Sequence, residues 1–141
     1  MPENVAVSRK QIGGEIPMVV SEISDRTIYT GLFGSIDSAR IAEVSDKLIA
    51  CFEIKEVDYV IMDLGNVDVI DSSVSGYLLR LADTLVLLGI TPIFCGIKGY
   101  LAESMVKANV NLKEHIIKRN LKAALSTTYE MSGKKIVDIN E

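Results

Sequence analysis

The pattern of apolar and polar positions predicts four helices. From Asp37 to Phe52 and from Ser72 to Leu88, apolar residues recur at intervals of three and four positions, which places them on one side of each helix. Gly89 follows the second of these segments and is a natural helix stop. Shorter helices are expected over residues 100–108 and 121–129, the latter preceded by a capping residue, asparagine 120.

Strands are expected over five further segments. Residues 17–23 and 27–33 are rich in β-forming side chains and are separated by three polar residues, which suits a hairpin. Residues 59–64 are almost continuously apolar and are therefore expected at the centre of a sheet. Residues 91–95 and 114–118 complete the set. The order ββαβαβαβα predicts an α/β fold, with a mixed β-sheet and helices packed on it.

The composition is typical of a single soluble domain. Of 141 residues, 48% are hydrophobic and 24% are charged, and the net charge of -4 disfavours nucleic acid and anionic membrane surfaces as partners. We expect a flexible tail over residues 1–15, one domain over 16–130 and a second tail over 131–141. The start of the chain lacks the apolar core of a signal peptide and no apolar run is long enough to span a membrane, which predicts a cytoplasmic location.

Cys51 and Cys95 both lie inside apolar segments. This placement favours small buried side chains in a reducing compartment over a disulfide framework.

Residues for catalysis are hard to assemble from this sequence. His115 is the only histidine, and the serines in the stretch from 71 to 76 do not match the G-x-S-x-G pattern of a hydrolase nucleophile. A small hydrolase that uses Ser73 or Ser75 with His115 is kept as an unfavoured alternative. We therefore expect a protein without catalytic residues.

Metal and cofactor sites are also not expected. The carboxylates of Asp63, Asp68 and Asp71 lack the spacing of a calcium loop, and we interpret them as a solvated strand end. The two glycines in residues 96–101 match neither a dinucleotide-binding motif nor a P-loop.

Hydroxyl side chains follow an aspartate at the start of both long helices. Ser72 and Ser73 follow Asp71, and Ser38 follows Asp37. One interpretation is purely structural, because serine and aspartate are preferred helix caps worth about 1 kcal/mol. The other is regulatory, because a phosphate on such a hydroxyl adds about -1.5 to -2 charges near free backbone N–H groups. The residues alone leave both interpretations open.

These residues resemble a known family, the STAS domain of bacterial anti-anti-sigma factors and, more closely, of stressosome proteins. The resemblance covers residues 17–129 and implies the STAS fold. The stretch Asp71-Ser72-Ser73-Val74 looks like the phosphoacceptor site of that family, which implies Ser72 as the acceptor and Ser73 as a substitute. Residues 34–40 are similar to the first-helix start of the sensor-bearing stressosome paralogues, which implies Ser38 as a second acceptor. The separation of 34 positions from Ser38 to Ser72 agrees with the spacing of those paralogues.

The resemblance implies a non-enzymatic switch in a partner-switching stress pathway. Its partners would be a serine/threonine kinase of the anti-sigma type, a PP2C-type phosphatase and other STAS scaffold proteins, in a homo- or hetero-oligomer. About 16 residues precede the first strand, where the sensor-bearing paralogues carry a whole domain. The alternative is a stand-alone STAS domain that regulates an anion transporter or a lipid-trafficking system. The partner interface would include Asp37, Asp71, Val74, Ser75 and Gly76.

Overall fold

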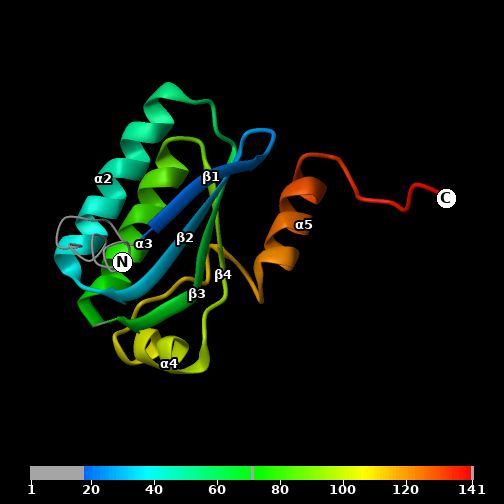
Figure 1. Cartoon of the computed structure of the whole chain (residues 1–141). Coiled ribbons are helices and arrows are strands. Elements are labelled where there is room, and N and C mark those ends of the chain that lie inside the picture. Colours follow the sequence, from blue (N-terminus) through cyan, green and yellow to red (C-terminus); the bar gives the residue numbers. More distant parts are fainter. Residues whose placement is uncertain (1–17, 71, 141) are drawn as a thin grey trace, which may run out of the picture.

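The computed structural model describes residues 18–70 and 72–140 of the chain. The tail expected over residues 1–15 lies outside this range. The elements are β1 (Met18–Ser24), β2 (Thr27–Ile36), α2 (Ser38–Ile54), β3 (Tyr59–Ile70), α3 (Ser72–Leu87), β4 (Thr91–Cys95), α4 (Gly99–Lys107), β5 (Ile116–Lys118) and α5 (Leu121–Met131) (Figure 1). The predicted ββαβαβαβα order is confirmed, and residues 132–140 follow α5 outside any helix or strand.

The five strands form one sheet in the order β1-β2-β3-β4-β5. The β1–β2 hairpin is antiparallel, whereas β3, β4 and β5 are added in parallel, each after a helix. The sheet is therefore mixed, as predicted, and β3 occupies its centre. The predicted ends of two helices are also confirmed. At the start of α5, Asn120 Oδ1 accepts a hydrogen bond from the Ala123 backbone N–H at 2.9 Å. After α3, Gly89 ends the helix with a φ of +83°.

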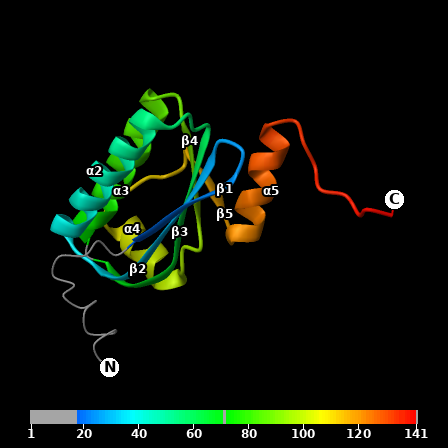
Figure 2. The ribbon, with the colours of Figure 1, turned by 45° about the horizontal axis from the view of Figure 1, so that its top comes forward.

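The two faces of the sheet are covered differently. Helices α2, α3 and α4 share the larger core with one face, and α5 packs on the other (Figures 1 and 2). Alternation along β3 divides its side chains between these layers, with Val60, Met62 and Leu64 in the larger core and Ile61 beneath α5. Further members of the larger core are Ile28, Leu32, Ile41, Val44, Leu48, Leu78, Leu85 and Leu101.

Strand β3 is twice as long as the pattern of apolar residues predicted. The sequence indicated a strand that ends at Leu64 and a polar loop after it, but residues 65–70 continue the strand along β2. Beyond Asp63 only β2 accompanies it, because β4 ends at Cys95, the partner of Asp63. The polar residues that suggested a loop lie on this exposed extension, where Asn66 and Asp68 face solvent.

Asp63 is not the solvated strand end that we expected. It is half-buried, and its carboxylate accepts hydrogen bonds from the Tyr29 hydroxyl at 2.8 Å and from the Gly65 backbone N–H at 2.9 Å. Burial, together with the hydrogen bond to Asp63, raises the pKa of Tyr29 to about 12. Burial and the negative charge of Asp63 likewise raise the pKa of the Cys95 thiol to about 12. Cys95 is thus a buried, protonated core residue as predicted, whereas Cys51 is only partly buried.

In the part of the chain that the structure describes, no helix is both long and apolar enough to cross a bilayer. Within the same residues, no group of three or more histidine, cysteine, aspartate or glutamate side chains is placed to hold a metal ion.

Candidate functional site

The starts of α2 and α3 lie side by side because their preceding strands end in register. Ile36 and Ile70 are the last Cα partners of the parallel strands β2 and β3. Each is followed, two positions later, by the first residue of a helix, Ser38 in α2 and Ser72 in α3. Parallel neighbouring strands therefore deliver both helix starts, and the hydroxyls on them, to the same edge of the sheet.

Two register shifts in β3 set this alignment. At the beginning of the strands, Thr27 faces Tyr59, which is 32 positions further along the chain, whereas Ile36 faces Ile70, which is 34 positions further. The shifts fall between Gly31 and Phe33 and between Gly34 and Ser35 of β2. Each one adds a residue to β3, as a β-bulge does. The 34-residue spacing noted in the sequence thus has a structural origin in these bulges.

Asp37 is the cap of α2. Its backbone is extended, with a φ of -114° and a ψ of 178°, and its Oδ1 accepts a hydrogen bond from the Arg40 backbone N–H at 3.0 Å. The structural interpretation of the aspartate is therefore confirmed. Because Asp37 caps the helix, the hydroxyl of Ser38 is not used for capping.

The Ser38 hydroxyl instead meets Ser73. The two Oγ atoms lie 3.2 Å apart in a hydrogen bond in which either oxygen is able to donate. Ser38 is half-buried and Ser73 is exposed. Two candidate acceptors from segments 35 residues apart thus share one hydrogen bond at the surface.

Two further residues of the candidate acceptor site are Ser72 and Asp71. Ser72 is the first residue of α3, so it precedes Ser73 at the same helix start. Asp71 lies outside the described residues.

The partner-interface candidates divide into exposed and buried residues. Asp37 is exposed and Gly76 is half-buried. Val74 and Ser75, however, are fully buried, so in this conformation neither offers a side chain to a partner. Their burial follows from the helical phase, because Val74 begins the stripe that continues with Leu78 and faces the larger core. The Ser75 hydroxyl has no hydrogen-bond partner inside this core.

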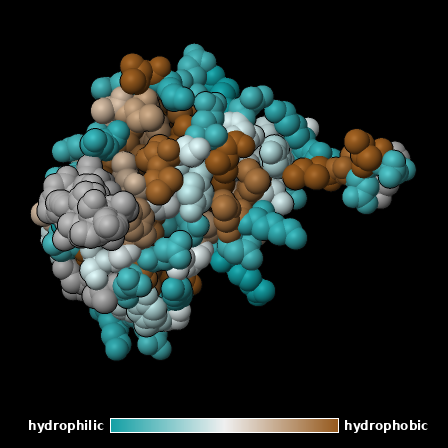
Figure 3. Space-filling view, viewed as in Figure 1, coloured by the Kyte–Doolittle hydropathy of each residue, from teal (hydrophilic) through white to brown (hydrophobic). Residues whose placement is uncertain are grey.

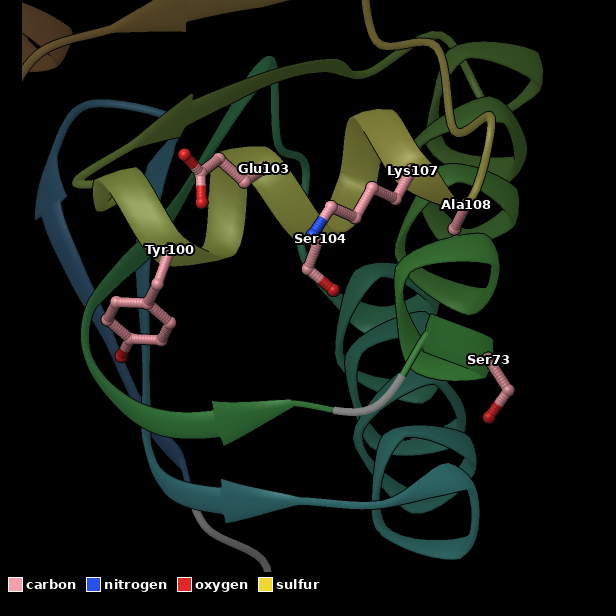
Figure 4. Close-up of a pocket in the computed structure, with 6 residues that line it drawn as sticks. All are labelled: Ser73, Tyr100, Glu103, Ser104, Lys107 and Ala108. Carbon is pink, nitrogen blue, oxygen red and sulfur yellow. The ribbon is translucent and has the colours of Figure 1, made fainter.

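A pocket of about 660 Å³ opens beside Ser73, between the start of α3 and the length of α4 (Figure 4). Five other residues line it: Tyr100, Glu103, Ser104, Lys107 and Ala108. The Tyr100 hydroxyl donates a 2.6 Å hydrogen bond to the Val67 carbonyl and thereby ties α4 to the bulged end of β3. The sequence did not single out these residues, because α4 is far from Ser73 in the chain.

His115 lies too far from the serines for a Ser-His pair. Its Nε2 is 2.9 Å from Asp83 Oδ1, and its ring packs edge-on against Phe94. Asp83 is ten residues beyond Ser73 on α3, about 15 Å at 1.5 Å per residue. His115 also precedes β5 rather than lying in it. The hydrolase alternative is therefore wrong for this structure.

Comparison with known proteins agrees with this fold. A family model described as the STAS domain matches residues 18–124. The RsbT co-antagonist protein RsbRA of Bacillus subtilis strain 168 is 26% identical over 110 residues, which are 78% of this chain and 40% of that protein. The chain thus spans about two fifths of the length of this relative.

Solved structures resemble the chain over most of its length. A serine-to-glutamate variant of RsbS from Moorella thermoacetica aligns with a TM-score of 0.72 and 16% identity, and covers 82% of this chain and 97% of its own. A subunit of the stressosome, described as a signal integration and transduction hub, aligns with a TM-score of 0.66 and 18% identity, over 81% of this chain and 98% of its own. Such identities show a shared fold. Together with the family match over most of the chain, they establish that the protein belongs to the STAS domain family.

Proposed function

We propose that this chain is a phosphorylation-controlled interaction switch of a bacterial stress pathway, and a component of a stressosome-type assembly. The observation that carries the proposal is the 3.2 Å contact between Ser38 Oγ and Ser73 Oγ at two adjacent helix starts. The names of its relatives support it, since RsbRA is an RsbT co-antagonist and the aligned stressosome subunit belongs to a signalling hub. A serine/threonine kinase of the anti-sigma type would be the binding partner, and a PP2C-type phosphatase would reverse the modification in the cytoplasm.

The shared hydrogen bond makes the surface sensitive to a single phosphate. A phosphoryl group on Ser38 or Ser73 replaces a hydroxyl hydrogen and brings about -1.5 to -2 charges to a contact between neutral groups. Nearby helix N–H groups favour that charge, because the dipoles of α2 and α3 both present their positive ends here. The Asp37 carboxylate beside Ser38 repels it. A phosphate that is attracted by the helix N–H groups and repelled by Asp37 changes the shape and the charge of the surface without unfolding either helix.

Ser72, Ser38 and Ser73 are the proposed acceptors. Ser72 carries the family motif, whereas Ser73 makes the observed contact with Ser38. A kinase that binds over the two helix starts would approach Asp37 and Gly76 as well. Val74 and Ser75 would act from below the surface, by holding the first turn of α3 in place.

The pocket next to Ser73 supports binding of a protein surface more than binding of a small anion. Lys107 is a cation in its lining, but Glu103 lies one helical turn earlier and offsets that charge. We therefore assign α4 to the rim of the proposed protein contact.

Mass spectrometry of the phosphorylated protein tests the proposal. The protein is incubated with the anti-sigma-type kinase of its source organism and ATP, and phosphate is mapped on the parent and on Ser38→Ala, Ser72→Ala and Ser73→Ala variants. Each substitution should remove phosphate from its own position, whereas Ser126→Ala, at an exposed position of α5, should change nothing. Phosphate on none of the three serines would overturn the switch.

A binding measurement then tests whether charge controls the contact. Affinity for the same kinase is measured by calorimetry for Ser38→Asp, Ser72→Asp and Ser73→Asp and for the matching alanine variants. An aspartate at the true acceptor should weaken binding relative to alanine at that position, because it adds charge to the contact. Equal affinities at all three positions would contradict this role.

A further inference from the structure

The segment that follows α5 exposes an unusual amount of aliphatic surface. In residues 134–140, the side chains of Ile136, Val137 and Ile139 are 74%, 58% and 94% exposed. Isolated surface aliphatics are common, but here three lie within four residues of a segment without helix or strand, interrupted only by Asp138. All three are β-branched, which favours an extended backbone. Figures 1 and 2 both show this segment projecting away from the sheet.

Strand β1 offers an unpaired edge with exposed aliphatic side chains. It is the edge strand of the sheet and, within the described residues, pairs with β2 alone. Its middle five residues are exposed on both faces, and Val19, Val20 and Ile23 are the aliphatic ones among them. Figure 3 shows hydrophobic side chains over β1 and again along the segment after α5. An exposed edge with apolar side chains is a template for another strand.

Length and charge match between the two segments. Strand β1 has seven residues, as many as residues 134–140. Glu22 lies near the end of β1 and Asp25 lies in the turn that follows it, whereas the segment begins with Lys134 and Lys135. An antiparallel pairing therefore brings the lysines to the acidic end of β1. Attraction of this kind already exists within one chain, where Lys134 Nζ lies 3.9 Å from Asp25 Oδ2.

We propose that residues 134–140 of one copy add as an antiparallel strand to the β1 edge of a second copy. The backbone would supply hydrogen bonds along the edge, and Ile136, Val137 and Ile139 would cover the exposed aliphatic side chains of β1. The occupant is a second copy because the segment points away from its own sheet, and because each chain carries both halves of the contact. Two copies then bind reciprocally about a two-fold axis. This contact specifies the assembly part of the proposed function.

The experiment compares three forms of the full chain across a range of concentrations, without kinase or ATP. The first is the parent, and the second carries Ile136→Ser, Val137→Ser and Ile139→Ser. The third is a matched control, in which three aliphatic residues that are also mostly exposed are replaced elsewhere, with Ile54→Ser, Leu87→Ser and Val106→Ser. Light scattering after size exclusion gives the mass, and hydrogen exchange reports the amides of residues 18–24 and 134–140.

The parent and the control should double in mass with concentration, and their amides in both segments should exchange more slowly as the dimer forms. The segment variant should keep the mass of one chain, with fast exchange in β1. Slow exchange in a particle of one-chain mass would mean that the segment binds its own β1 and would overturn the proposal. So would fast exchange in both segments of the parent at every concentration. Because no kinase is present, either failure leaves the phosphorylation proposal standing.

Discussion

Ile36 and Ile70 are Cα partners at the carboxyl ends of β2 and β3, and their alignment decides which serines meet. Ser38 and Ser72 each follow two positions later as the first residue of a helix. The turn of α3 then brings the next serine, Ser73, to the Ser38 hydroxyl. The proposed switch thus depends on strand register as much as on the serines themselves.

The first prediction concerns the energy of the Ser38–Ser73 hydrogen bond. In a double-mutant cycle of Ser38→Ala and Ser73→Ala, we expect a coupling of about 0.5 to 1.5 kcal/mol in the free energy of unfolding, because each single change already removes the shared bond. Urea denaturation measures it. Ser38→Ala combined with the remote Ser126→Ala should be additive within about 0.5 kcal/mol. If the Ser38–Ser73 pair is as additive as the Ser38–Ser126 pair, the hydrogen bond contributes nothing to the free energy of unfolding.

The second prediction separates capping from signalling at the start of α2. Asp37→Ala should lower the free energy of unfolding by about 1 kcal/mol, because the Arg40 backbone N–H loses its acceptor. Asp37→Asn should retain most of the stability, because the amide oxygen accepts the same bond. Thermal and urea unfolding of both variants check this. A loss as large with asparagine as with alanine would point to the charge of Asp37 instead.

The third prediction uses two glycines with positive φ as a matched pair. At Gly89, with a φ of +83°, an added Cβ meets open space, so Gly89→Ala should cost about 1 kcal/mol from backbone strain alone. At Gly96, with a φ of +75°, the Cβ would lie 2.8 Å from Asp63 Oδ1 and 2.8 Å from the Gly65 N atom. Gly96→Ala should therefore cost about 1 to 3 kcal/mol more, as overpacking does. Equal losses in urea unfolding would refute the close approach.

The fourth prediction concerns alkaline pH. The pKa values of Tyr29 and Cys95 rise from 10.0 and 9.0 to about 12 in the folded protein. Between these limits the unfolded chain releases protons that the folded chain retains, so the stabilisation is complete below pH 9 and is lost as pH rises towards 12. Tyr29→Phe should make this loss shallower, because phenylalanine cannot ionise. The free energy of unfolding, measured from pH 7 to 11 for the parent and for Tyr29→Phe, tests this. If the two curves run parallel, Tyr29 does not contribute to the loss of stability.

The sequence predicted most of the fold, because its helices and strands have strong periodicity. It failed at residues 65–70, where Gly65, Asn66 and Asp68 are residue types that favour turns, although they extend β3. Only pairing with β2 reveals this strand, and such pairing is a long-range property.

The sequence predicted that the candidate acceptors lie at two helix starts, but not which side chains are in contact there. The 34-residue spacing pointed to two equivalent helix starts, and the structure brings those starts together. The partner of Ser38, however, is set by the rotation of about 100° per residue in α3, which brings Ser73 to the Ser38 hydroxyl. The same rotation buries Val74 and Ser75, which the motif alone had assigned to the surface.

The capping of α2 by Asp37 has a consequence for how such proteins diversify. Because the aspartate supplies the cap, an exchange of Ser38 for threonine or alanine leaves the start of α2 capped, and the alanine loses only the hydrogen bond to Ser73. A gene copy that loses this hydroxyl would still yield a folded subunit, and in the proposed switch that subunit would keep only the acceptors at the start of α3. In the proposed switch, a single substitution would therefore give a subunit with fewer acceptor positions, and an assembly that mixed such subunits with the parent would respond at a different threshold.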